Sequence, residues 1–105
     1  MHDFSKYKKI RIPINNQIHT LNVANDQKTR QEGLSNVDHL GFREGMIFIY
    51  DNPVHYSFTM EATKIPLQII FISENFEVIQ QFSCKEKQKG EITPWEPYKY
   101  VIEVA

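Results

Sequence analysis

The most restrictive feature of the sequence is a run of five apolar residues, Met46–Tyr50, with no polar residue among them. A surface helix, or a strand with one face in water, would place polar residues at regular intervals within such a run. A strand that is covered on both faces has no such need. The run therefore predicts a central strand of a sheet that is packed on both sides.

Other short apolar runs predict further strands. Apolar residues alternate with polar residues or proline in Lys9–Ile14, which is typical of a half-buried strand. Pro13 has no N–H to donate, so this strand is expected at an edge of the sheet. Asn15-Asn16 tolerates positive φ and predicts a tight hairpin to a second strand. The remaining predicted strands are Gln17–Val23, His55–Met60, Leu67–Ile72, Val78–Phe82 and Tyr98–Val104.

One short helix is predicted over Asn25–Leu34. Asn25 or Asp26 can cap its N-terminus by accepting hydrogen bonds from unpaired backbone N–H groups, and Gly33 can adopt the left-handed conformation that ends a helix. With about seven short strands and one helix, the sequence predicts a mostly β fold. We expect a compact single domain over residues 1–105, a β-barrel or a sandwich-like arrangement.

Composition limits the classes of partner. The chain has 105 residues, 12 Lys+Arg, 13 Asp+Glu and a formal net charge of -1, which argues against a dedicated nucleic-acid binder. No apolar stretch approaches the roughly 18 residues of a membrane span, and the first residues lack the apolar run of a signal peptide. We therefore expect a cytoplasmic protein that binds neither nucleic acid nor membranes. Cys84 is the single cysteine, so no intramolecular disulfide is possible.

Residues that often carry chemistry form no recognisable motif. The four histidines, His2, His19, His39 and His55, lie far apart, and no two are four residues apart, as a helical zinc pair requires. A pairing of His19 with His55 through the fold stays open. The four glycines are too scattered for a phosphate-binding loop. The sequence predicts no metal and no cofactor, and it favours a protein that is not an enzyme.

The segment Tyr56–Ile65 and its neighbours form the candidate ligand site. Aromatic rings, a methionine and hydroxyl groups occur close together there, as they do in the walls of small-ligand pockets. Packing in the core explains the same residues about as well. An arginine at the end of the predicted helix can contact a ligand, or hold the helix turn through a salt bridge or a backbone carbonyl. The candidate ligand-binding residues are Arg30, Tyr56, Phe58, Met60, Thr63 and Trp95.

Six segments resemble a known family when they are taken in order. They are Val23-Ala24, Arg30–Leu34 (Arg-x-x-Gly-Leu), Gly45–Phe48, Met60–Gln68, Ile69–Ile72 and Val101–Glu103. From about Leu21 to the end, the chain resembles the family called domain of unknown function 192 (DUF192), an uncharacterised group of bacterial and archaeal proteins. The resemblance implies a compact, mostly β single domain and no established activity.

The chain departs from the family's pattern at two polar positions. Ala62 stands where the family usually has Asn, and Gln68 stands where it usually has Asp. A carboxylate can act as a general base and a glutamine cannot, so we do not expect turnover. The main hypothesis is a small non-catalytic binding or interaction module that forms a homodimer. The alternatives are a structural or assembly component, and an enzyme acting on a small molecule or sugar through Arg30, Glu61, Thr63 or Glu103.

Overall fold

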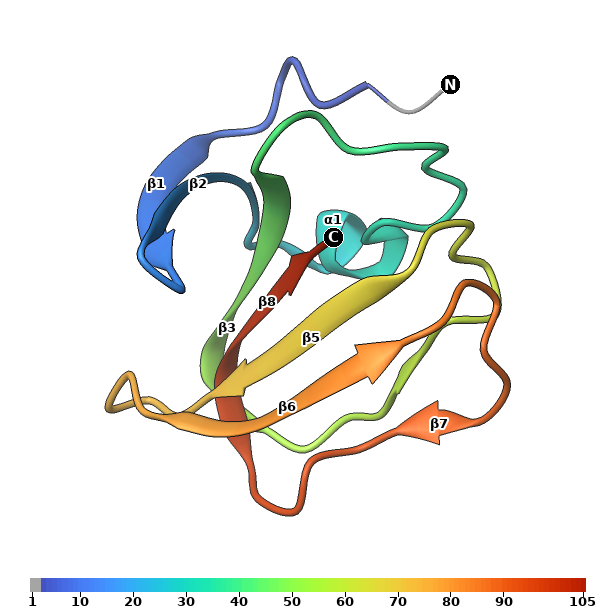
Figure 1. The fold of residues 1–105 in the computed structure, drawn as a ribbon. Helices are drawn as coiled ribbons and strands as arrows, with labels where there is room; N and C mark the ends of the chain where they lie inside the picture. Colours follow the sequence, from blue (N-terminus) through green and yellow to red (C-terminus); the bar gives the residue numbers. More distant parts are fainter. Residues whose placement is uncertain (1–2) are drawn as a thin grey trace.

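The computed structural model describes residues 3–105, and over this range it has eight strands and one short helix (Figure 1). The predicted mostly β class, with one short helix, is confirmed. In chain order the elements are β1 (Lys9–Ile14), β2 (Gln17–Ala24), α1 (Gln27–Glu32), β3 (Glu44–Val54), β4 (Phe58–Thr59), β5 (Leu67–Ile72), β6 (Val78–Cys84), β7 (Glu91–Ile92) and β8 (Tyr98–Val104).

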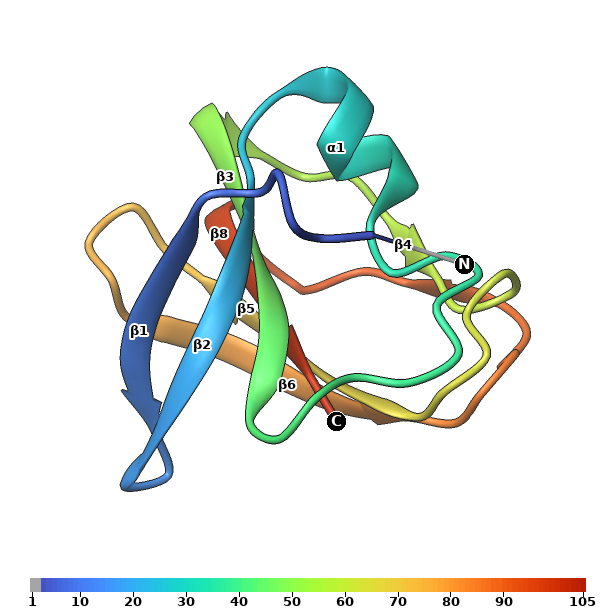
Figure 2. The same ribbon diagram turned by 90° about the horizontal axis from the view of Figure 1, so that it is seen from above.

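Six strands form one sheet in the order β1-β2-β3-β8-β5-β6, and β4 pairs with β7 in a separate two-stranded ribbon. Neighbouring strands are antiparallel except β2 and β3, which are parallel and joined through α1 and the loop after it. The sheet is not closed, because β1 and β6 do not pair with each other. Figures 1 and 2 show it strongly twisted, with the β1–β2 hairpin turned across β5 and β6. The arrangement is sandwich-like and not a barrel.

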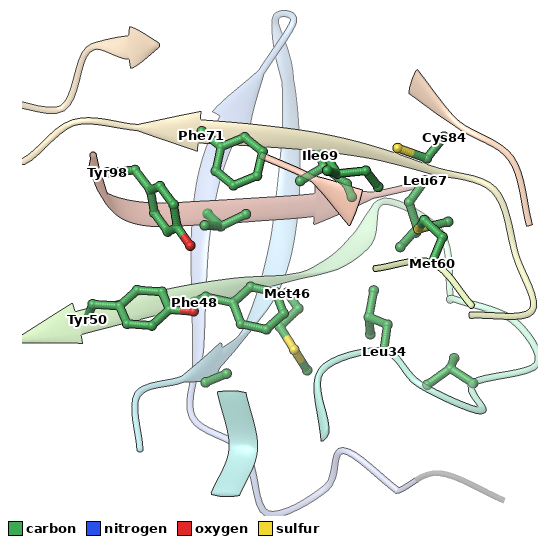
Figure 3. Close-up of a cluster of buried hydrophobic side chains, with 14 residues drawn as sticks. Leu34, Met46, Phe48, Tyr50, Met60, Leu67, Ile69, Phe71, Cys84 and Tyr98 are labelled. Carbon is green, nitrogen blue, oxygen red and sulfur yellow. The ribbon is translucent and has the colours of Figure 1, made fainter. Parts of the chain in front are cut away.

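Both faces of the large sheet are packed with apolar side chains. On one face, Met46, Phe48 and Tyr50 of β3 point toward the side chains of β5 and β8 (Figure 3). On the other face, Ile47 and Ile49 of β3 pack in a second cluster. That cluster contains residues of β1 and β5 together, so the sheet curls until its first strand shares a core with β5. The prediction of a strand covered on both faces is confirmed.

The same alternation settles the directions of two neighbouring residues of β5. Ile70 belongs to the second cluster, and Phe71 belongs to the first. Both are buried, because successive strand residues point to opposite faces and each face is covered. A continuous apolar run is the sequence pattern that such a strand requires.

Turn chemistry follows the sequence closely in two places. Asn15 and Asn16 both have positive φ, at 52° and 64°, in the predicted hairpin. Asp26 caps α1 in a reciprocal capping box with Thr29, whose backbone N lies 2.8 Å from Oδ1 of Asp26. The helix is shorter than predicted, because Gly33 follows directly after Glu32 with φ 49°.

The segment between β3 and β5 differs from the prediction. The predicted strand His55–Met60 is reduced to the two residues of β4, and its partner β7 adds an eighth strand that the sequence does not reveal. Two-residue strands carry no periodicity, so only the tertiary structure defines them. Within residues 3–105, no helix has the length and apolar character needed to cross a bilayer.

The aromatic centre of the core provides a test of the assigned packing. Phe71 is fully buried and contacts the rings of Phe58, Phe82 and Tyr98 at centroid distances of 5.6, 5.8 and 4.9 Å. We predict that Phe71→Ala lowers the free energy of unfolding by about 3–5 kcal/mol, measured by urea denaturation. The control, Phe42→Ala at a side chain that is 87% exposed, should change it by less than about 1 kcal/mol. Equal effects of the two substitutions would contradict the assigned core.

A candidate ligand-binding cleft

A cleft is lined by residues of α1, the end of β3 and the segment around β4. Figure 2 shows how these three elements are arranged. The cleft has two adjoining parts, which share Arg30, Gln31, Tyr50 and Tyr56. We call them the inner hollow, of about 220 Å³, and the outer hollow, of about 570 Å³. The inner hollow is also lined by Phe48, Phe58, Thr63 and Glu103, and the outer hollow by Gln27, Asp51, Asn52 and Val54.

Glu103 forms the floor of the inner hollow. It lies in β8, the fourth strand of the six, and it pairs with Met46 of β3 and Ile69 of β5. Both neighbours are fully buried members of the first core cluster, and Glu103 itself is only 5% exposed. Among residues 3–105 its carboxyl group has no hydrogen-bond or ion-pair partner. A polar group therefore stands in the middle of an apolar layer and faces the hollow.

Burial determines the protonation state of this carboxyl group. Removing it from water disfavours the charged form, and with no compensating donor this raises the pKa of Glu103 from 4.5 to about 8. The folded protein thus holds a neutral carboxylic acid here at pH 7. A neutral acid can both donate and accept a hydrogen bond.

Arg30 lies on the wall of the cleft that α1 provides. Its Nη1 atom donates a hydrogen bond to the carbonyl oxygen of Ile49 at 3.0 Å, and its guanidinium carbon lies 4.8 Å from the centre of the Tyr50 ring. The capping box at Asp26 fixes where the helix begins and so fixes the position of Arg30 one turn later. Arg30 therefore clamps a backbone carbonyl of β3 and also lines both hollows.

The opposite wall is the chain between β3 and β5, and hydrogen bonds to the β7–β8 connection hold it in place. The Tyr98 hydroxyl donates to the carbonyl oxygen of Tyr56 at 2.9 Å, and the hydroxyls of Ser57 and Thr93 lie 2.6 Å apart. The backbone of Thr63 is fixed at two points, since its N–H donates to Met60 at 2.9 Å and its carbonyl oxygen accepts from Lys87 at 2.8 Å. Thr63 is 5% exposed and lines the hollow.

Two glycines allow the chain to pass close to this site. At Gly33 the φ is 49°, and a Cβ atom would lie 3.2 Å from the ring of Phe48. At Gly45 a Cβ atom would collide with the backbone oxygen of Glu103 on the neighbouring strand. Both glycines belong to the segments that carry the family resemblance, and both need the absence of a side chain.

The structure brings four of the six sequence-predicted site residues together. Arg30, Tyr56, Phe58 and Thr63 line the inner hollow. The other two lie elsewhere: Met60 is 1% exposed within the core, and Trp95 is 70% exposed and lines neither hollow.

The two glutamates named for the enzyme alternative also lie in different places. Glu103, considered only for the enzyme alternative, is the floor of the site, whereas Glu61 is exposed and lies beside Thr59. Tyr50 and Phe48 also line the site, although sequence reasoning assigned them only to a strand. The sequence feature that could have identified Glu103 is its position in the otherwise apolar run Val101–Val104. An ionisable residue is rarely buried in such a strand unless it has a function.

Ala62 and Gln68, the departures from the family pattern at polar positions, lie outside the cleft, whereas Ser35, which stands where the family commonly has Met, lines the inner hollow. Ala62 is exposed, and its carbonyl oxygen accepts a hydrogen bond from the Asn36 backbone at 2.9 Å. Gln68 accepts hydrogen bonds from Gln81 and Ser83 on β6, at 3.1 and 2.9 Å. Neither residue lines the inner or the outer hollow.

The described residues contain no cluster of three or more His, Cys, Asp or Glu side chains suited to a metal ion. His19 lies 3.1 Å from the carbonyl oxygen of Gln17, and His55 lies 2.6 Å from that of Pro94. Each of these two rings therefore has its own backbone contact. His2 lies outside the described residues.

Comparison with known proteins supports the resemblance seen in the sequence. The family model of DUF192, described as an uncharacterized ACR, matches residues 10–105, so the match extends further toward the N-terminus than Leu21. No curated protein matches this chain.

Two crystal structures share the fold. One, of a protein of unknown function from Novosphingobium aromaticivorans DSM 12444, has a TM-score of 0.83 and 25% identity over 98% of this chain and 77% of its own. The other is described as a candidate transcription regulator from Sinorhizobium meliloti 1021. It has a TM-score of 0.80 and 25% identity over 93% of this chain and 81% of its own.

The buried carboxyl group predicts a distinctive dependence of stability on pH. Between pH 4.5 and about 8 the unfolded chain has lost the Glu103 proton and the folded chain retains it. The folded state binds more protons in this window, so stability falls as pH rises. We expect the loss from Glu103 to approach about 5 kcal/mol by pH 9, at about 1.36 kcal/mol per pKa unit.

The measurement is urea denaturation of wild type and Glu103→Gln at pH 5, 7 and 9. Glu103→Gln should be the more stable of the two at pH 9. The difference in the free energy of unfolding between the two proteins should decrease toward pH 5. Glu86→Gln, at an exposed glutamate, is the matched control and should follow the wild type. Parallel curves for wild type and Glu103→Gln would show that the carboxyl group is not buried as described.

Proposed function

The chain belongs to the DUF192 family, and we propose that it is a non-catalytic binding module for a small molecule, with the ligand in the cleft between α1 and β4. Glu103 is the polar anchor at the floor, and Arg30 and Thr63 are further polar contacts. The rings of Tyr50, Tyr56 and Phe58 provide the apolar walls.

The observation that carries the proposal is the buried, unpartnered carboxyl group of Glu103. A buried polar group without a partner costs about 1–3 kcal/mol, and buried polar groups are normally hydrogen-bonded. Replacing Glu103 by an apolar residue would remove that cost from the folded protein. Because the group faces a hollow, a ligand with an O–H or N–H donor can supply the missing hydrogen bond. The ligand then removes the free-energy cost of the unpaired carboxyl group, and this gain adds to the affinity.

Binding is favoured over turnover by the lining of the two hollows. Among the described residues that line them there is no histidine and no cysteine. These are the most common proton carrier and the most reactive nucleophile of enzyme sites. A neutral carboxylic acid at Glu103, beside hydroxyl and aromatic groups, is better suited to recognition.

A role in transcription regulation through DNA binding is not part of the proposal, although the Sinorhizobium protein is described as a candidate transcription regulator. The net charge of -1 provides no excess of positive charge for a phosphate backbone. Self-association remains a separate prediction, for which the unpaired edge of β6, with Val78 63% exposed, is the surface we propose.

The test uses two matched probes, n-butylamine and 1-butanol, whose donors are an ammonium and a hydroxyl group. In ¹H–¹⁵N NMR titrations at pH 7 we expect saturable shifts of the Thr63 backbone amide and the Arg30 side chain with at least one probe. Glu103→Leu removes both polar atoms and should abolish the saturable shifts, while Glu86→Gln should retain them. Shifts confined to residues outside the cleft, or no saturation with either probe, would overturn the proposal.

A further inference from the structure

The arrangement of charges in the cleft indicates which class of small molecule it binds, and this inference rests on the function proposed above. We propose that the ligand is a small zwitterion. Its ammonium group lies at Glu103 in the inner hollow, and its carboxylate lies at Arg30.

The inner hollow has the composition of a site for an organic cation. Four aromatic residues line it, Phe48, Tyr50, Tyr56 and Phe58, together with the Glu103 carboxyl group. Ammonium groups are attracted to the faces of aromatic rings, most strongly where water is excluded. The cleft already holds one cation in this way, since the Arg30 guanidinium lies 4.8 Å from the Tyr50 ring centre.

The outer end of the site is suited to an anion. A guanidinium has five N–H donors in a fork that matches a carboxylate, and Arg30 uses one of its nitrogens on Ile49. The side-chain amides of Gln27, Gln31 and Asn52 line the outer hollow around it and can donate further hydrogen bonds. Asp51 and Glu32, in the lining of the outer and inner hollows, are the acidic groups that limit how much negative charge the site accepts.

Arg30 and Glu103 do not pair with each other. Arg30 and Glu103 both line the inner hollow, but among residues 3–105 they form no ion pair with each other or with any other side chain. A basic group and an acidic group, separated within one cleft, match a molecule that carries the opposite charges at its two ends. A ligand with one charge satisfies only one of them.

Binding of an ammonium group must also move a proton. The neutral Glu103 carboxylic acid would release its proton to solvent on pairing with the cation, because a neighbouring positive charge favours the carboxylate. The titratable groups that face it are Tyr50 on β3, Tyr56 in the segment before β4, Cys84 on β6, and Arg30 and Glu32 on α1. Burial raises the pKa of both Tyr50 and Cys84, so the tyrosine hydroxyl and the thiol stay protonated between pH 6 and 8.

The experiment compares three probes by calorimetry at pH 6.5: 4-aminobutyrate, n-butylamine and butyrate. The first has both charged ends, and the other two have one each. We expect 4-aminobutyrate, or a neighbour in the series from glycine to 6-aminohexanoate, to bind at least about tenfold tighter than either single-ended probe. Repeating the titration in two buffers of different ionisation enthalpy should show release of about one proton per ligand.

Substitutions test which side chain binds each charged end of the ligand. Arg30→Gln should bind the amino acid no better than n-butylamine, and Arg30→Lys, which keeps the charge, should restore part of the difference. Glu103→Gln should abolish proton release. Lys28→Gln, at an exposed residue of α1 outside the cleft lining, is the control and should behave as wild type.

The outcomes separate this inference from the proposed function. If n-butylamine binds as tightly as every amino acid in the series, the zwitterion is wrong and the cleft is still a binding site. If Arg30→Gln and Lys28→Gln bind 4-aminobutyrate equally well, the anionic end is misplaced, and this inference is also overturned.

Discussion

The burial of β8 is the constraint on which the rest of the structure depends. This strand lies between β3 and β5, and apolar clusters cover the sheet on both of its faces. The side chains of Val101–Val104 must be apolar, paired or neutral, because all four of these residues are buried. Glu103 meets this requirement by remaining protonated, because burial disfavours its charged form and no side chain of residues 3–105 forms an ion pair with it.

Much of the fold could be predicted because burial on two faces leaves a readable pattern. The run Met46–Tyr50 and the Asn15-Asn16 turn each have a local physical cause that acts within a few residues. The β4–β7 ribbon has no such local cause. Its strands are two residues long, and they are defined by pairing with a segment more than 30 residues away. Tertiary contacts decide such an element, and sequence periodicity says nothing of it.

The site could be predicted only in part, and the reason differs from one residue to the next. Tyr56 and Thr63 were accessible to sequence reasoning because they lie in a connecting segment rich in rings and hydroxyls. Trp95 has the same chemistry, but its loop carries it to the surface, where it is 70% exposed. Met60 turns into the core. Which way a loop side chain points depends on packing that no short sequence window contains.

Arg30 shows why an arginine that holds the fold together can also serve a site. Its hydrogen bond to Ile49 ties the last turn of α1 to β3, and its contact with Tyr50 orders a ring of the cleft wall. Both interactions hold the guanidinium in one orientation before any ligand arrives. A side chain that is already ordered loses little conformational entropy on binding, so its remaining donors act at low cost. The clamp and the binding role therefore support each other, and the same argument applies to Glu103, which the sheet holds rigidly at the floor of the cleft.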